Sequence, residues 1–321
     1  MPNHTLALLL AVASLLSPGA AFPQAYLTQP IRLVVPTGPG SVADTVTRLL
    51  GGALAQELSQ AIVIENKVGA NGIIGAETVA QAAPDGTTLI VGNLSTHAMN
   101  SALYSKLPYD PVRQFTPVSL VGFVPYVLVV GTHVPAQNMA ELAALARAQP
   151  GKLTYATGSA PSIVTMEMIK RAAGMDVLQV NYKTVPLGLT DVMAGRIDMM
   201  VADTGTAIPQ IRAGKVRAIV LATAARSPLL PEVPSLPEAG LPRLDMVGWW
   251  GWFAPAGTSE AAVTRLSEAL AKITARKDLR DKVAGFGAEL KGSTPAELRT
   301  FTQQQTEMYA RMIKEAGIKP E

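Results

Sequence analysis

The sequence predicts an α/β protein of two domains, built on largely parallel sheets with helices around them. Its 321 residues fit two domains at the usual size of about 100–200 residues each. Short apolar runs alternate along the chain with stretches of helical periodicity, an order typical of parallel sheets. Several of these runs are continuously apolar, as expected for strands that are buried on both faces.

Three buried strands are predicted near the start of the chain, at residues 31–35, 62–64 and 88–91. A helix is predicted between them, because apolar residues recur at i, i+3, i+4, i+7 and i+8. These residues are Val46, Leu49, Leu50, Ala53 and Leu54. One face of this helix should therefore pack on the sheet.

Four further strand-like runs lie at residues 126–130, 153–156, 197–202 and 216–222. Between the first two, Asn138 and Glu141 have the spacing of a capping box and predict a helix that stops before Pro150. A proline-rich stretch at residues 228–242 predicts an ordered surface connection.

The remaining chain holds three tryptophans within residues 247–253, followed by two predicted amphipathic helices. Thr294 followed by Pro295 and Glu297 is a strong helix start. We expect one domain boundary near residues 124–125 and the other after the proline-rich stretch. From the residue pattern alone, the C-terminal helices can complete either domain.

Residues 1–25 are predicted to be a signal peptide that directs export. Residues 6–16 are apolar except for Ser14, and this run is much shorter than the roughly 20 residues that a membrane helix needs. Small residues follow at positions 19–21, with Ala25 as a second candidate cleavage site. No lysine or arginine precedes the run, which leaves a buried N-terminal helix as the alternative.

The composition excludes several classes of function. The chain has no cysteine, which removes thiol nucleophiles, cysteine–zinc sites, iron–sulfur clusters and disulfides. Its three histidines, at positions 4, 97 and 133, are too few for a histidine-rich metal site. A net charge of +3, evenly spread, does not give the basic surface of a nucleic-acid-binding protein. We therefore expect no metal, cofactor or nucleic-acid partner.

Residues 36–44, at the turn from the first strand into the first helix, form the first candidate ligand site. Glycines allow close backbone approach, and the free N–H groups of a helix start favour an anion such as a carboxylate or phosphate. The glycine spacing matches neither a dinucleotide-binding nor a P-loop motif. An ordinary tight turn, with a helix cap at residue 41 or 44, is the alternative. The candidate residues are Thr37, Gly38, Pro39, Gly40, Ser41 and Asp44.

Other strand ends carry weaker candidates. The hydroxyl-rich turn after residue 156 can supply a second set of donors, or be a common loop. Open α/β sheets bind ligands at strand ends, so Thr96, His97 and Asp203 are candidates too. The alternatives are that His97 is a structural histidine and that Asp203 caps the following turn. The tryptophans are expected in packing and not in a ligand cage. The candidates of the turn are Thr157, Gly158, Ser159 and Ser162.

No catalytic residue is expected. The G-x-S-x-G motif is absent, and paired carboxylates of the glycosidase type have no signature. Binding is the chemistry that the sequence makes visible. An enzyme on a two-lobed fold is the outside alternative, with His97 and Asp203 as its candidates.

Short blocks along the chain follow the order of the motifs of a known family. Pro36-x-x-Pro39-Gly40, with Asp44 and Arg48, is similar to the family's P-F-x-P-G-G-x-x-D-x-x-A-R loop. Similar blocks follow at residues 62–75, 84–89, 97–100, 107–118, 214–218 and 253–258. Together they resemble the Bug family, the extracytoplasmic solute receptors of tripartite tricarboxylate transporters.

The resemblance implies a two-lobed periplasmic-binding-protein fold of type II, with each lobe a mostly parallel sheet and the ligand in the cleft. Residues 26–124 and 248–321 would form one lobe and residues 125–247 the other, so that the C-terminal helices return to the first lobe. The turns at Thr37 to Ser41 and Thr157 to Ser162 would hold a ligand carboxylate through backbone amides, hydroxyls and water.

The implied function is that of a monomeric periplasmic receptor with neither catalytic activity nor a cofactor. It would capture a small organic carboxylate and deliver it to the subunits of a membrane transporter. Closure of the lobes would present the liganded shape to these partners. A receptor that presents its ligand to a membrane sensor kinase is the alternative within the same fold.

Overall fold

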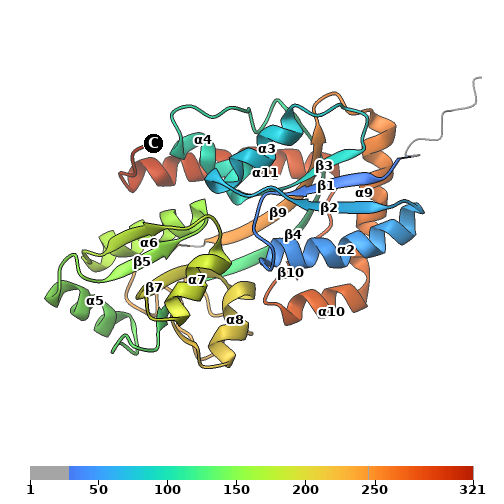
Figure 1. The fold of residues 1–321 in the computed structure, drawn as a ribbon. Coiled ribbons are helices and arrows are strands. Elements are labelled where there is room, and N and C mark those ends of the chain that lie inside the picture. The colour runs from blue at the N-terminus through green and yellow to red at the C-terminus, as the bar shows by residue number, and fades with distance from the viewer. Residues whose placement is uncertain (1–28, 245, 321) are drawn as a thin grey trace, which may run out of the picture.

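One ten-stranded sheet runs through two lobes in the computed structural model, which describes residues 29–244 and 246–320 (Figure 1). The first lobe contains β1 (Ile31–Val35), β2 (Ile62–Asn66), β3 (Thr88–Asn93), β9 (Val247–Pro255), β10 (Glu289–Leu290) and the first part of β4 (Phe115–Gly131). The second contains the rest of β4 with β5 (Thr154–Thr157), β6 (Leu178–Asn181), β7 (Met199–Asp203) and β8 (Val216–Leu221). The predicted signal peptide lies outside the described residues.

Both lobes share one strand order. It is β2-β1-β3-β9-β4 in the first lobe and β6-β5-β7-β4-β8 in the second. In each lobe the first three strands are parallel, and the last two run antiparallel to their neighbours. The sheets are therefore mixed, which corrects the expectation of largely parallel sheets. Continuous apolar runs do not reveal strand direction, because an antiparallel strand covered on both faces has the same pattern.

Helices cover both faces of the sheet in the first lobe (Figure 1). One face carries η1 (Ala70–Gly72), α3 (Ile73–Ala80), η2 (Ser95–Met99), α4 (Asn100–Leu103) and α11 (Pro295–Glu315). The other carries α2 (Val42–Leu58), α9 (Glu260–Ala275) and α10 (Lys277–Gly285). The predicted apolar stripe of α2 packs here, with Val46, Leu50 and Leu54 fully buried.

The second lobe has the same layers. The helices α5 (Met139–Ala148) and α6 (Ala160–Ala173) cover one face of its sheet, and α7 (Val185–Met193) and α8 (Thr204–Arg212) cover the other. The predicted cap of α5 forms, since Asn138 Oδ1 accepts the backbone N–H of Glu141 at 3.0 Å. Within the described residues, no helix has the length and apolar character needed to cross a bilayer.

The strand β4 connects the two lobes. It pairs with β9 as far as Pro125, opposite Val247, and with β7 from Tyr126 onward, opposite Asp203. The predicted lobe boundaries, at residues 124–125 and 247–248, fall within β4 and at the start of β9. Whether the two parts behave as separate units stays a prediction.

Three details of the sequence prediction were wrong. The strand at residues 62–64 is not buried: β2 is an edge strand, and Val63 is 52% exposed. The strand predicted from residue 126 starts at Phe115 as part of β4, where Pro117 and Pro125 interrupt the apolar pattern. After the tryptophans come the three helices α9, α10 and α11, where two were expected.

Candidate functional site

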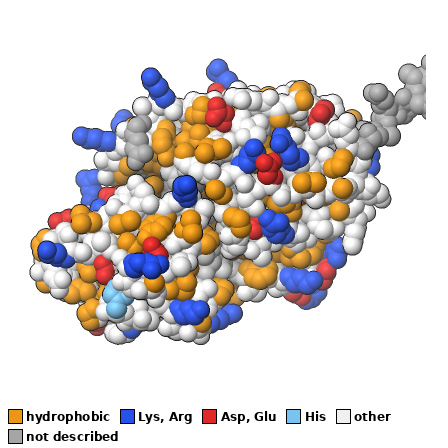
Figure 2. All heavy atoms as spheres, viewed as in Figure 1, with side chains coloured by type: hydrophobic (Ala, Val, Ile, Leu, Met, Phe, Trp, Pro, Cys, Tyr) orange, Lys and Arg blue, Asp and Glu red, His pale blue; other side chains and the backbone are white. Residues whose placement is uncertain are grey.

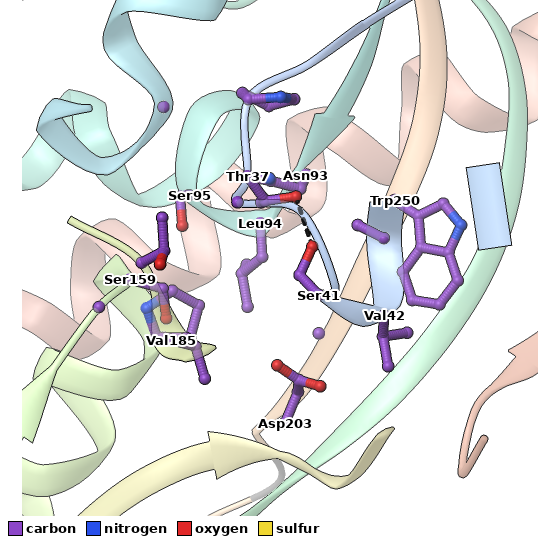
Figure 3. Close-up of a pocket in the computed structure, with 18 of the residues that line it drawn as sticks. Thr37, Ser41, Val42, Asn93, Leu94, Ser95, Ser159, Val185, Asp203 and Trp250 are labelled. Atoms are coloured by element: carbon purple, nitrogen blue, oxygen red, sulfur yellow. Dashed lines mark hydrogen bonds between the residues drawn. The ribbon is translucent and has the colours of Figure 1, made fainter. Parts of the chain in front are cut away.

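A cavity of about 80 Å³ lies between the lobes (Figure 3). Its wall is formed by the turns that follow β1, β3, β5, β6 and β7, by η1 after β2, and by β4 and β9 where the chain crosses. Ligands of open α/β sheets bind at these carboxyl ends of strands. A cavity of this size can hold several water molecules, which favours a small ligand.

The helices α2, α6, α7 and α8 each place an N-cap with a polar side chain at this cavity. The N-cap residues of α2, α6, α7 and α8 all lie in its wall: Ser41, Ser159, Thr184 and Asp203. Each helix N-terminus carries unpaired N–H groups and a charge of about +0.5. The charged side chains of the described wall are Lys183 and Asp203, which are of opposite sign. The helix termini therefore make the cavity attractive to an anion.

Charge is not concentrated elsewhere on the face seen in Figure 2. Lysine, arginine and acidic side chains are scattered there over both lobes. Within the described residues, no three or more acidic or histidine side chains form a group that could hold a metal ion.

Some residues of the first predicted turn line the cavity, and others only shape the turn. Thr37, Gly38 and Ser41 lie in the wall, and the hydroxyls of Thr37 and Ser41 form a hydrogen bond of 2.9 Å (Figure 3). Pro39 and Gly40 are exposed and lie outside the wall. Gly40 has a φ of +79°, a conformation that favours glycine, so its role is to shape the turn.

Asp44 supports this turn from outside the wall. Its carboxylate accepts the N–H of Gly40 at 3.1 Å, Nε of Arg48 at 3.1 Å and Nδ2 of Asn66 at 2.8 Å. Asn66 also donates to the carbonyl of Thr37 at 3.1 Å. Burial raises the pKa of Asp44, but these hydrogen bonds outweigh it and hold the pKa below its ordinary value. Asp44 is therefore ionised and stabilises the loop through these hydrogen bonds.

The residues of the second predicted turn have the same two roles. Gly158 and Ser159 lie in the wall, where Ser159 faces the first lobe (Figure 3). Thr157 and Ser162 are buried behind it. The hydroxyl of Thr157 donates to a side chain of β6 at 2.9 Å, and that of Ser162 to a carbonyl of β7 at 2.6 Å. Both residues therefore join the strands that position the turn.

Asp203 acts as a helix cap and also lies in the wall, so the two alternatives from the sequence do not exclude each other. One carboxylate oxygen accepts the backbone N–H of Thr206 at 2.8 Å. Figure 3 shows the carboxylate directed into the cavity. Burial raises the pKa of Asp203 above its ordinary value.

Thr96 and His97 lie outside the cavity wall. Asn93, which does line the cavity, and Thr96 exchange backbone-to-side-chain hydrogen bonds of 3.0 Å. The ring of His97 stacks on Phe253 at 4.0 Å and meets the edge of Phe115 at 4.7 Å. Burial lowers the pKa of His97 to about 3, so the imidazole is neutral. The structural interpretation of His97 therefore fits its surroundings.

The sequence analysis missed the turn after β6. Lys183, Thr184 and Val185 belong to the wall, and Thr184 occupies the N-cap position of α7 without a capping hydrogen bond from its side chain. The preceding strand has four mostly exposed residues and gives no apolar run. A usable signal was present nonetheless: a threonine two residues before Pro186 marks a helix start.

The tryptophans have two roles. Trp252 is buried in the core of the first lobe, as expected. Trp249 and Trp250 are almost as deeply buried, yet they also line the cavity. Trp249 meets the edge of Phe301 in α11 at 5.2 Å, which holds it in place.

Residues 46–318 match the family described as "Tripartite tricarboxylate transporter family receptor". The chain belongs to this family. It is a family of solute-binding receptors and not of enzymes, in agreement with the expectation that the chain has no catalytic activity. The resemblance to the Bug receptors is confirmed with it.

Solved structures support this TctC-family assignment. The R. palustris protein Rpa4515 with adipate has 31% identity and a TM-score of 0.89, over 92% of this chain and 100% of that chain. The periplasmic binding protein BugD has 30% identity and a TM-score of 0.88, over 92% and 100%. MatC from Rhodopseudomonas palustris, with bound malate, has 34% identity and a TM-score of 0.85, over 90% and 100%. The two-lobed fold predicted for this receptor is therefore confirmed.

Proposed function

We propose that this receptor binds a small organic carboxylate between its lobes in the periplasm and delivers it to the membrane subunits of a tripartite tricarboxylate-type transporter. The observation that carries the proposal is the meeting of four helix N-caps, Ser41, Ser159, Thr184 and Asp203, at one cavity. Backbone N–H groups at helix starts bind carboxylates without a full countercharge. Two relatives of the same fold hold the dicarboxylates adipate and malate.

The wall also supports a small ligand. Hydroxyls of Thr37, Ser41 and Ser159 supply further donors, and the glycines at 38 and 158 allow close approach of the Thr184 segment to this wall. Val124, Trp249 and Trp250 form apolar wall around the polar groups. A concave site with a few polar groups in an apolar surround is typical of small-molecule binding.

Calorimetry tests the binding on a chain that has first been unfolded and then refolded. Refolding removes any retained ligand, and short mono- and dicarboxylates are then compared with their amides and with neutral sugars. We expect carboxylates to bind and their amides to bind at least tenfold more weakly. Sugar binding without carboxylate binding would contradict the proposal.

Three serine-to-alanine variants separate binding from stability. Ser41→Ala and Ser159→Ala each remove an N-cap in the cavity wall, and Ser259→Ala removes the N-cap of α9, outside it. Each should lower the free energy of unfolding by about 1 kcal/mol. Only the first two should weaken carboxylate binding. Equal effects of all three on affinity would contradict the assignment of the site.

Delivery is tested in cells that lack the gene for this chain. A transport role predicts loss of uptake of the labelled carboxylate found by calorimetry. A sensor role predicts normal uptake and a lost transcriptional response to the same carboxylate.

A further inference from the structure

Asp203 is a buried acid without a countercharge. It is 8% exposed, and the groups that hydrogen-bond its carboxylate belong to Thr206 and to its own backbone, with the N–H of Thr206 at 2.8 Å. No lysine or arginine of the described residues forms an ion pair with Asp203 or shifts its pKa. Burial of a carboxylate is costly unless it is paired. The side chain is directed into the cavity (Figure 3), so the pairing group can come from a ligand.

Asp203 differs from the serine caps in the cavity wall. At α2 and α6 the N-caps in the wall are the neutral hydroxyls of Ser41 and Ser159, each of which accepts one backbone N–H of its helix. At α8 the cap is the carboxylate itself, which accepts hydrogen bonds and carries negative charge. The cavity wall therefore combines neutral hydroxyl caps with one carboxylate cap.

The neighbour of Asp203 in the sheet does not neutralise its charge. Tyr126 is directly opposite Asp203 in the register of β4 and β7, and it lines the cavity as well. Ser159 acts as a hydrogen-bond partner of the Tyr126 hydroxyl. Burial and the charge of Asp203 raise the pKa of Tyr126 well above its ordinary value, so the phenol is neutral and supplies no countercharge.

We propose that the ligand of this receptor carries an ammonium group as well as a carboxylate, and that the Asp203 carboxylate, which is directed into the cavity, binds the ammonium. The inference rests on the proposed function, since it assumes that the helix ends of α2 and α6 hold the ligand carboxylate. Lys183 in the wall is a cation and provides no acceptor, so the ammonium is assigned to Asp203.

Two triplets of ligands test it, each with one carbon skeleton. They are alanine, lactate and propionate, and γ-aminobutyrate, 4-hydroxybutyrate and butyrate, all small enough for the cavity. Propylamine serves as an amine without a carboxylate. Calorimetry on the refolded full chain should show that, in at least one triplet, the ammonium member binds at least tenfold tighter than the unsubstituted acid.

Asp203→Asn should reduce this preference to less than twofold. Because it removes a negative charge from the cavity wall, the affinity for the unsubstituted acid should not fall. Asparagine keeps the helix cap, and Asp203→Ser is the second variant if the first unfolds. Asp198→Asn is the matched control, because Asp198 also accepts a backbone N–H, at 2.7 Å, but lies outside the cavity wall. It should keep the full preference.

The outcomes separate this inference from the proposed function. Equal binding of all members of both triplets, or equal weakening of all members by Asp203→Asn, overturns the role of Asp203 and leaves carboxylate binding standing. Binding of propylamine without any carboxylate overturns the proposed function and supports a cation at Asp203. No binding by any of the seven probes overturns the inference as well.

Discussion

Gly38 and Thr184 meet across the cavity so closely that residue 38 has no space for a side chain. A β-carbon on Gly38 would lie 2.6 Å from Cγ2 and 2.8 Å from Cβ of Thr184. Gly38 belongs to the turn between β1 and α2 in the first lobe, and Thr184 is the N-cap of α7 in the second. The lobes reach this degree of closure because position 38 is a glycine.

Gly38→Ala should therefore weaken binding by holding the lobes apart. Overpacking of this kind costs typically about 1–3 kcal/mol, which is roughly a 5- to 150-fold loss of affinity. The melting temperature without ligand should change little, because the open form relieves the clash. Calorimetry with a bound carboxylate and thermal unfolding without it measure the two effects.

Two further variants control this result. Gly52→Ala in α2 has open space around the new methyl group and should keep the affinity of the wild type. Thr184→Ser removes Cγ2, the atom nearest to the added carbon, and should restore part of the affinity in the double variant. Wild-type affinity in Gly38→Ala would show that binding does not need this contact.

Asp44→Ala should loosen the first ligand turn. The change leaves the N–H of Gly40 and one N–H of the Asn66 amide without their acceptor, which costs about 1–3 kcal/mol of unfolding free energy. Arg48→Met removes a half-exposed ion-pair partner of Asp44 and should cost about 1 kcal/mol or less. Urea unfolding measures both. Similar losses would mean that the ion pair, and not the turn, accounts for the stability.

His97 should make stability depend on pH. Its pKa is about 3 when buried, against an ordinary value of 6.5, so between these values the unfolded chain binds more protons. The free energy of unfolding should then fall by about 1.4 kcal/mol for each pH unit of acidification in this range. His97→Phe keeps a ring against Phe253 and should lose this part of the slope. Urea unfolding at pH 7.5 and 5.0 compares the two proteins, and equal slopes would contradict the prediction.

Lys183 should assist the capture of anions without fixing their position. It is exposed although it contributes to the cavity wall, and an exposed charge is worth up to about 1 kcal/mol and is screened by salt. Lys183→Gln should weaken carboxylate binding roughly 2- to 5-fold at low ionic strength, with the difference disappearing in high salt. Lys152→Gln, an exposed lysine outside the wall, is the control. A loss that persists in high salt would indicate a direct bond to the ligand.

The sequence predicted the fold class and most strands, because the central strands are continuously apolar and end at glycines or helix caps. It did not predict β6, whose exposed edge position removes the apolar pattern. Nor did it predict that the last two strands of each lobe run antiparallel to their neighbours, since strand direction depends on where the chain crosses between lobes.

For the candidate site, the sequence located two of the three turns that place N-cap hydroxyls in the wall. It grouped Gly38 and Ser41 with Asp44, although Asp44 faces away from the cavity. Motif spacing shows which residues share a turn and does not show which side of the turn faces a ligand. Thr184 was missed together with β6, and its contact with Gly38 depends on the placement of the two lobes.

The position of β9 has a consequence for the order in which the chain can fold. β9 lies between β3 and β4 in the sheet, although it follows both in the sequence. While the chain is synthesised, β3 and β4 have no partner on these edges until residues 247–255 emerge. The apolar strand edges of the first lobe can therefore pair with other chains during most of synthesis. The sheet of this lobe is completed only when β9 has been made. A nascent chain of this receptor should need protection from aggregation until its last quarter is made.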